Sequence, residues 1–285
     1  MRILTYSAQR IRSILDEMSL RLFPQVRKRR YFANVLKATD ADFLARRVDP
    51  ELRLLPLLLA PGKEFLDIGA HIGEYCFVAE RYIDPAHIYA FEPQAYYARR
   101  IRKLFPHAHV AQVALSDHAG TATLKIPIMR GRAYATRATL ERFSERGETD
   151  ARYETVPLIT LDQFRKEYPV GKVGCMKIDV EGHERSVIAG AHETLRQDRP
   201  NLIIEIEQRH HQEPIQEVFS DILSAGYQGY FFDPSEKCFR PLSEFSVGRF
   251  QAMNDFKTGA YVNNFVFLPE ESSIKVAFPQ SPFLP

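Results

Sequence analysis

The sequence FLDIGAHIG at residues 65–73 decides the fold. A short apolar run leads into two glycines, Gly69 and Gly73, and a helical pattern begins at once. Glycine lets the backbone turn tightly and lets a ligand approach it, while the N-terminus of a helix offers free N–H groups to an anion. The spacing D-x-G-x-x-x-G differs from the G-x-G-x-x-G fingerprint expected of a dehydrogenase. The candidate cofactor-binding residues of this stretch are Asp67, Gly69, Ala70, His71 and Gly73.

Short apolar runs alternate with helical patterns from residue 63 onward, which is typical of parallel strands joined by helices. The fold class is therefore α/β. Strands are predicted at 64–68, 86–91, 109–115, 173–178, 201–207, 226–231 and 260–267. Helices are predicted at 72–81, 94–105, 161–168, 183–196 and 213–225.

Two further strand-like stretches, 121–126 and 153–159, flank a polar, Arg-rich segment at residues 129–150. This segment is too long and too charged for a simple connection, so it is predicted to fold over a site or to be disordered. Its arginines and Tyr134 would suit an anionic or carbohydrate ligand, and a solvated loop is the alternative.

Composition sets outer limits on the kind of protein. With 285 residues, 45% of them hydrophobic, the chain can bury a large core. Its three cysteines show no C-x-x-C spacing, which supports neither a disulfide scaffold nor a cysteine zinc site. No apolar run approaches the roughly 20 residues of a membrane span, and the first twenty residues lack the apolar centre of a signal peptide. A cytoplasmic location is expected.

The N-terminal part differs in charge from the rest. Residues 1–62 hold 12 Lys or Arg against 6 Asp or Glu, which leaves 26 against 30 for the remainder of the 38 and 36. Apolar residues recur at spacings of three and four within residues 3–23, as in an amphipathic helix, and a basic run follows at 27–30. This helix either packs on the main domain or contacts a membrane surface or another polyanion. The expected organisation is a helical, basic extension at 1–62, a main domain at 63–270 with an insertion at 127–152 near the expected substrate site, and a tail at 271–285.

Glu92 follows the second predicted strand, 23 positions after Gly69. The carboxyl ends of neighbouring parallel strands open onto one crevice, where a carboxylate can accept both hydroxyls of a ribose. Ser116 and Asp117 follow the third strand and would lie beside an adenine, although S-D-x-x-G is also a good turn sequence. These residues together suggest a cofactor with a ribose and a carboxylate or phosphate.

The fourth predicted strand runs into DVEGHE at residues 179–184. A plain turn does not require three carboxylates and an imidazole, so acid–base chemistry is indicated. Glu181 and Glu184 could instead cap the next helix, and Glu184 is expected to face the sheet. Asp179, at the strand tip, is the expected functional residue.

An ordered set of motifs resembles the FkbM family of S-adenosylmethionine-dependent methyltransferases over roughly residues 60–270. The motifs are DIGAHIGEY at 67–75, FEP at 91–93, ALSD at 114–117, TLDQF at 160–164, KIDVEGHE at 177–184 and NFVFLP at 264–269. The resemblance implies a class I methyltransferase (Rossmann-like) fold, in which a seven-stranded, mostly parallel sheet with an antiparallel last strand carries helices on both faces. It also implies S-adenosylmethionine as cofactor and methyl transfer to a hydroxyl of a sugar, glycan or polyketide-type acceptor. His71 stands where the family more often has asparagine, and its charge is expected to depend on pH.

A general base would help a hydroxyl attack a methyl group, and the candidates are Asp179, Glu181 and His183. Asp179 or His183 is preferred, with Glu184 positioning the turn. No metal ligand is assigned, and a divalent ion on the same three candidates is the alternative. His210 and His211 are candidates for the acceptor site only.

Two other function classes compete. A nicotinamide or nucleotide-sugar oxidoreductase is disfavoured by the missing third glycine and the absence of a Tyr-x-x-x-Lys pair. A nucleic-acid methyltransferase is disfavoured by the near-neutral charge and the absence of an Asn/Asp-Pro-Pro-aromatic motif. The expected partner is a small-molecule or glycan acceptor.

Overall fold

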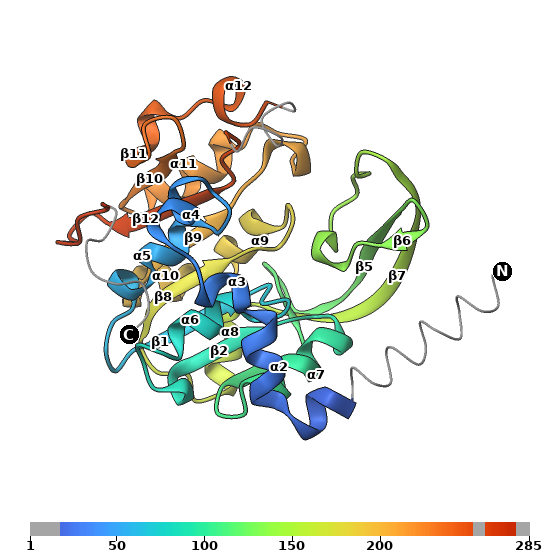
Figure 1. Cartoon of the computed structure of the whole chain (residues 1–285). Helices are drawn as coiled ribbons and strands as arrows, with labels where there is room; N and C mark the ends of the chain where they lie inside the picture. The colour runs from blue at the N-terminus through green and yellow to red at the C-terminus, as the bar shows by residue number, and fades with distance from the viewer. Residues whose placement is uncertain (1–17, 253–259, 278–285) are drawn as a thin grey trace.

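The centre of the molecule is an eight-stranded sheet with the strand order β11-β10-β12-β9-β8-β1-β2-β3 (Figure 1). The computed structural model describes residues 18–252 and 260–277. The strands are β1 (Glu64–Ile68), β2 (Ile88–Phe91), β3 (His109–Ala111), β8 (Val173–Ile178), β9 (Asn201–Glu205), β10 (Tyr227–Asp233), β11 (Cys238–Pro241) and β12 (Asn264–Pro269). The predicted α/β class is confirmed.

The sheet is mixed and has one strand more than the seven expected. β3, β2, β1, β8 and β9 run parallel, whereas β12 is antiparallel to β9 and β10, and β11 is antiparallel to β10. A tight turn adds the eighth strand, because Asp233 Oδ1 accepts hydrogen bonds from the backbone N–H groups of Ser235 (2.9 Å) and Glu236 (3.2 Å). The chain therefore returns at once along the free edge of β10.

Two predicted elements are divided in the structure. The run expected as one strand at 109–115 forms β3 in the main sheet and β4 (Ala114–Leu115) in a second sheet. The helix expected at 183–196 is divided into α9 (Glu184–Ala189) and α10 (His192–Asp198). Gly190 lies between these helices, where a Cβ would lie 1.9 Å from the Ser116 carbonyl oxygen. Close packing of the loop after β4 thus interrupts the helix.

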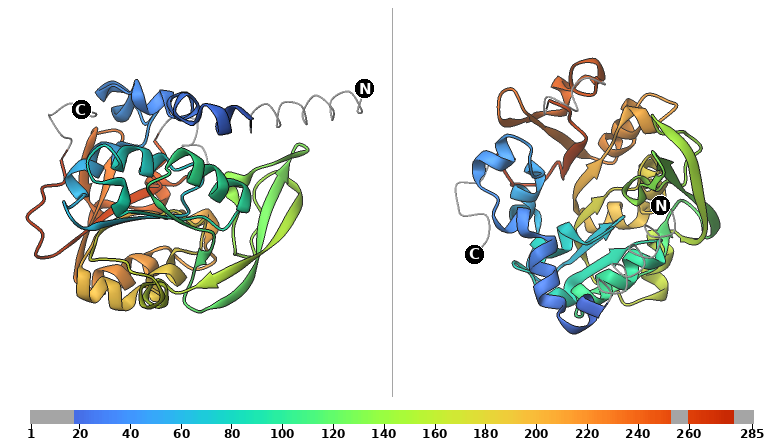
Figure 2. Two further views of the ribbon diagram at one scale, coloured as in Figure 1. Left: turned by 90° about the horizontal axis from the view of Figure 1, so that it is seen from below. Right: turned by 45° about the vertical axis from the view of Figure 1, so that its right-hand side comes forward.

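Helices cover both faces of the main sheet, as Figure 2 shows. One face carries α2 (Pro24–Tyr31), α3 (Ala33–Leu36), α4 (Asp40–Leu44), α5 (Pro50–Leu58), α6 (Glu74–Ala79) and α7 (Ala95–Leu104), and the other carries α8 (Leu161–Glu167), α9, α10 and α11 (Gln216–Ser224). A short helix, α12 (Val247–Phe250), lies near the edge formed by β10 and β11. Phe32, Phe43 and Leu52 of the N-terminal helices are fully buried in the same core as strand residues such as Phe65. Burying such side chains stabilises the fold by about 1.5–3 kcal/mol each.

The ends of the chain are described only in part. Most of the predicted helix at 3–23 and the last residues of the tail lie outside the described residues, while residues 18–22 are helical. None of the helices built from the described residues combines the length and apolarity needed to cross a bilayer.

A second, four-stranded sheet projects from the main sheet as a separate arm (Figure 1). Its order is β4-β7-β5-β6, with β5 (Gly120–Met129), β6 (Arg132–Ala133) and β7 (Glu148–Ile159). The segment at residues 130–147 between β5 and β7, here called the insertion loop, folds back toward the main sheet. Thr139 exchanges backbone hydrogen bonds with Lys125, and its Oγ1 donates to the Glu181 carbonyl oxygen at 2.6 Å. The insertion loop therefore contacts the turn after β8.

The burial of Glu51 predicts that the free energy of unfolding depends on pH. It is fully buried in the first turn of α5, and neither carboxylate oxygen has a hydrogen-bond partner among the described residues. Burial raises its pKa to about 7 from an ordinary value of 4.5. The folded chain thus binds this proton more tightly than the unfolded chain. The stability that comes with the protonated Glu51 side chain is therefore complete below pH 4.5 and is lost as pH rises through 7. Glu51→Gln should remove a loss of about 2.5 kcal/mol between pH 5 and pH 8.

Denaturant unfolding of both proteins at the two pH values measures this difference. The exposed Glu213→Gln is the matched control, and it should leave the pH dependence unchanged. An equal loss of stability in Glu51→Gln and the parent chain would contradict the assignment.

Candidate functional site

The carboxyl ends of β1, β2, β8 and β9 open onto a cavity of about 300 Å³. Gly69, Glu92, Asp179, Glu181 and His183 line it from the sheet. The insertion loop closes it from the opposite side with small and apolar residues, which are Ala135, Thr136, Ala138 and Leu140. Its volume lies at the lower end of the range for small-molecule sites, and its position is typical of ligand sites in open α/β sheets.

The turn after β1 leaves no room for a side chain at Gly69. This residue has φ +80°, and a Cβ would lie 1.8 Å from the Asp179 carbonyl oxygen. The amides of Gly69 and Ala70 both donate to the Phe91 carbonyl oxygen, at 2.9 and 3.1 Å. The turn is therefore fixed between β2 and the tip of β8.

His71 lines the cavity with a strained backbone at φ +45°. Its ring packs against Tyr97, with ring centroids 4.2 Å apart, and its Nε2 is buried without a hydrogen-bond partner among the described residues. Burial lowers the pKa of His71 to about 4, so the ring is neutral at physiological pH. The charge of His71 therefore changes with pH well below neutrality, because no charged group among the described residues offsets the cost of burying the cation.

Glu92 is almost fully buried at the end of β2. Its two oxygens accept hydrogen bonds from the backbone N–H groups of His71 and Gln94, both at 2.8 Å. Burial raises its pKa to about 7, although these two donors lower it. Each carboxylate oxygen has a second lone pair, so Glu92 can hold the turn and still accept from a ligand.

Asp67 faces a second, smaller cavity of about 140 Å³ that shares Gly69, His71 and Asp179 with the first. Its carboxylate accepts from the amide and the thiol of Cys76, and burial raises its pKa to about 6. Ala70 also lines this second cavity. Gly73, at φ +84°, packs against the Phe105 ring instead.

Ser116 and Asp117 lie outside the lining that the described residues give to either cavity. Ser116 is fully buried, and its Oγ lies 2.9 Å from His183 Nε2. The Asp117 carboxylate is half exposed and pairs with His118 at 2.6 Å. Val113, Ala114 and Leu115 line the first cavity here instead.

His183 is held on both sides of its ring. Nδ1 lies 2.6 Å from Glu141 Oε1 of the insertion loop, and Nε2 faces Ser116. Glu184 is buried, as expected, and accepts from the Gly182 amide at 3.0 Å and pairs with His211 Nε2 at 3.1 Å. The turn after β8 is thus fastened both to the insertion loop and to the segment after β9.

Three carboxylates, from Asp179, Glu181 and Glu205, come within 4.8 Å of one another and line the first cavity. Burial raises the pKa of each, and their mutual repulsion raises the pKa values of Glu181 and Glu205 further. Lys177 Nζ lies 3.6 Å from Asp179 Oδ2 and donates to Asn264 Oδ1 at 3.0 Å. The cavity wall therefore carries three closely spaced carboxyl groups, and a cationic ligand beside them would favour their ionised forms.

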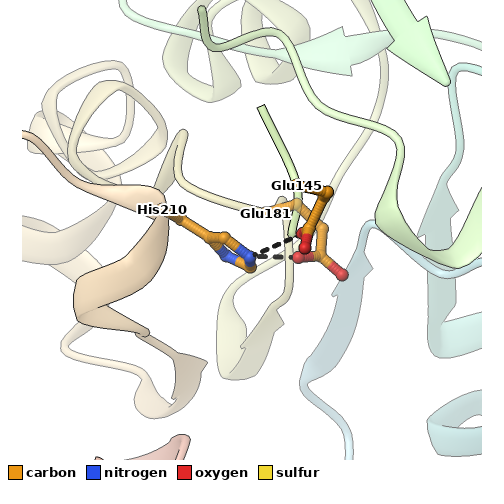
Figure 3. Close-up of side chains that lie close together, drawn as sticks. All are labelled: Glu145, Glu181 and His210. Carbon is orange, nitrogen blue, oxygen red and sulfur yellow. Dashed lines mark hydrogen bonds and ion pairs between the residues drawn. The ribbon is translucent and has the colours of Figure 1, made fainter. Parts of the chain in front are cut away.

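A second cluster joins Glu145, Glu181 and His210, and Figure 3 shows both carboxylates directed at the imidazole. Glu181 and Glu145 each approach a ring nitrogen of His210 at 3.2 Å. Glu145 is already paired with Arg209 at 2.8 Å and Arg137 at 3.0 Å. The arginines neutralise the carboxylate that a metal would need, so the cluster is an ion-pair network that fastens the insertion loop.

The structure does not gather the three residues that were weighed as ligands of a divalent ion, because His183 is engaged by Glu141 and Ser116. Sequence reasoning also missed Glu141, Glu145 and Glu205. The first two lie in a polar loop and carry no local signal. Glu205 is the last residue of β9, and Asp179 directly follows the last residue of β8. Side chains at the carboxyl ends of neighbouring parallel strands share one crevice, and this strand-end rule, which selected Asp179, also applies to Glu205.

A crevice at the strand ends, with a glycine turn and an acidic residue after the second strand, is typical of α/β enzymes that bind a nucleoside cofactor. The family model for the methyltransferase FkbM domain matches residues 67–230, more than half of the chain, so the chain belongs to the FkbM methyltransferase family. The matched region includes Gly69, Glu92 and Asp179.

Two solved structures align with this chain over most of its length. The methyltransferase FkbM from Methylobacillus flagellatus KT covers 76% of it at 15% identity with a TM-score of 0.45, and this chain spans 47% of that protein, about half of its length. The TehB-like SAM-dependent methyltransferase from Corynebacterium glutamicum ATCC 13032 Kitasato covers 80% of this chain and 93% of its own, at 11% identity with a TM-score of 0.40. A comparison with curated proteins finds no match.

Proposed function

We propose that the chain is an S-adenosylmethionine-dependent O-methyltransferase that acts on a hydroxyl of a sugar, glycan or polyketide-type acceptor. Membership of the FkbM family supports methyl transfer. The observation that carries the proposal is the acidic cavity in which Gly69, Glu92 and Asp179 meet. The three cysteines of the chain are free thiols, which supports the proposal of a cytoplasmic, reducing location.

The residues present fit this cofactor. Glu92 has free lone pairs for two ribose hydroxyls, and the unpartnered Nε2 of His71 offers a ligand contact in the same cavity. The missing side chain at Gly69 lets a ligand lie against the backbone. The positive charge of a sulfonium would favour the ionised forms of the carboxyl groups of Asp179, Glu181 and Glu205 and would be stabilised by them.

Asp179 is the better placed of the candidate bases. When bound, S-adenosylmethionine supplies an electrophilic methyl group, and the acceptor hydroxyl must lose a proton as it attacks. The Asp179 side chain is 35% exposed and lines both cavities, and its only ionic partner among the described residues is Lys177. Both nitrogens of His183 are engaged, and its side chain is 12% exposed. Asp179 Oδ therefore accepts the proton, while His183 positions the insertion loop.

In this proposal the insertion loop also excludes water from the cavity. Leu140 and Ala138 of the loop, together with Leu124 of β5, line the cavity with apolar surface, and excluding water strengthens the electrostatic interactions within it. Glu181 faces the same space with a strongly raised pKa and lies beside the acceptor position in this proposal.

Calorimetric titration tests the cofactor. Binding of S-adenosylhomocysteine with no binding of NAD is the expected result, and the opposite pattern would support an oxidoreductase. A methyl-transfer screen across glycans, polyketides and nucleic acids then tests the acceptor class. Transfer to nucleic acid alone would overturn that part of the proposal.

Glu92 makes cofactor affinity depend on pH. The ribose hydroxyls donate to the ionised carboxylate, so affinity should fall as pH drops through the pKa of about 7. Between pH 8 and pH 6 the dissociation constant for S-adenosylhomocysteine should rise about tenfold. Glu92→Gln should bind weakly at both pH values, whereas Glu51→Gln, outside the cavity, should keep the dependence. A flat profile in the parent chain would exclude Glu92 as the titrating contact.

A further inference from the structure

The N-terminal helical segment turns large apolar side chains toward solvent. Met18, Leu22, Phe23 and Val26, here called the N-terminal apolar patch, are 53%, 62%, 60% and 64% exposed. Leu20, between them, is fully buried in the core. Met18 and Leu22 are the described end of the apolar stripe expected either to pack on the main domain or to contact a membrane surface or another polyanion. At this end the stripe faces outward, and a different side of the helix anchors it.

The surroundings of the patch are strongly basic. Residues 18–37 hold six Lys or Arg and no Asp or Glu. Lys28 serves the fold, because it is buried and pairs with Glu80 at 2.5 Å. Arg21, Arg29 and Arg30 are exposed in the same segment as the patch.

We propose that the N-terminal apolar patch and these three arginines bind the surface of an anionic lipid bilayer. Apolar side chains on a basic helical segment enter the boundary between headgroups and acyl chains, and nearby guanidinium groups are attracted by anionic lipid. The proposal concerns a surface of the N-terminal segment and does not depend on the proposed methyl transfer.

Other occupants fit the surface less well. A symmetric contact with a second copy would bring the same arginines of two chains together, and like charges repel. The phosphates of a nucleic acid would pair with the arginines, but the four apolar side chains of the patch would then have no apolar partner. A bilayer surface satisfies both features at once.

Sedimentation of the full-length chain with vesicles tests the proposal. Binding should be stronger to a phosphatidylcholine–phosphatidylglycerol mixture than to phosphatidylcholine alone, and it should weaken as salt is raised. Combined Leu22→Ser, Phe23→Ser and Val26→Ser should lower partitioning at least about tenfold. Combined Arg29→Glu and Arg30→Glu should lower it by a similar factor and remove the preference for anionic lipid.

A matched control lies on the opposite face of the sheet. Leu223 of α11 and Arg196 of α10 are exposed there, so Leu223→Ser with Arg196→Glu should leave vesicle binding unchanged. Circular dichroism and denaturant unfolding report whether each variant is folded. The proposal is overturned if the patch variants bind vesicles as well as the parent chain does. It is also overturned if the chain binds RNA or heparin but not vesicles, or if the chain is a dimer that the patch variants dissociate.

Discussion

Replacing Asp179 by asparagine is expected to lower kcat by about 10²- to 10⁴-fold, which is the usual contribution of a general base. The affinity for S-adenosylhomocysteine should change much less, because Gly69 and Glu92 hold their positions through backbone contacts that do not use the Asp179 carboxylate. Partial desolvation at the strand tip raises the pKa of Asp179, so its carboxylate is a stronger base than that of a fully exposed aspartate. Asparagine keeps the size of the side chain and cannot accept a proton.

Two control variants make the result with Asp179→Asn interpretable. One replaces an aspartate outside the cavity, and the other replaces a second candidate base. Asp221→Asn on α11 removes a surface ion pair with Arg185 of α9, which contributes little to stability, and it should leave kcat unchanged. His183→Asn frees Glu141 and the insertion loop and should raise KM more than it lowers kcat. Full activity of Asp179→Asn on an identified acceptor would show that His183 or Glu181 takes the proton.

The features that the sequence predicts well are encoded within a few consecutive residues. The glycine turn at 69–73 and the carboxylates at Glu92 and Asp179 each follow a strand whose apolar run is visible, and the strand-end rule places them at one edge. The structure brings Gly69, Glu92 and Asp179 to one cavity. Turn geometry at the single-residue level, such as φ +45° at His71, is set by packing against Tyr97 and Glu92 and has no local signal.

Other features depend on contacts between distant segments. Glu141 and Glu145 lie in a polar loop that reads as solvated, yet Glu141 reaches His183 and Glu145 reaches Arg209 across more than forty positions of sequence. The run at 109–115 is one apolar stretch, and only the presence of β7 divides it between two sheets. Periodicity records which residues prefer burial, and it does not record which partner strand or loop will cover them.

Replacing Gly69 by alanine is expected to cost more stability than any conservative surface change and to weaken cofactor binding at least about tenfold. Two effects combine. The φ of +80° disfavours any residue with a Cβ by about 1–2 kcal/mol, and the new methyl group would lie 1.8 Å from the Asp179 carbonyl oxygen. That atom belongs to the backbone, so it cannot move aside as a flexible side chain would, and relieving the overlap should add about 1–3 kcal/mol. The displaced groups are the turn that is proposed to contact the cofactor and the strand tip that carries the proposed base.

Gly62→Ala separates the two effects, because Gly62 has a similar φ of +72° and nothing within 4 Å of an added Cβ. It should cost about 1–2 kcal/mol in denaturant unfolding and leave S-adenosylhomocysteine affinity unchanged. The excess loss in Gly69→Ala measures the overlap with Asp179, and the accompanying loss of affinity connects that overlap to the site. Equal losses of stability and equal affinities in the two variants would show that the turn can relax away from β8, and the cofactor would then have to lie elsewhere than against Gly69.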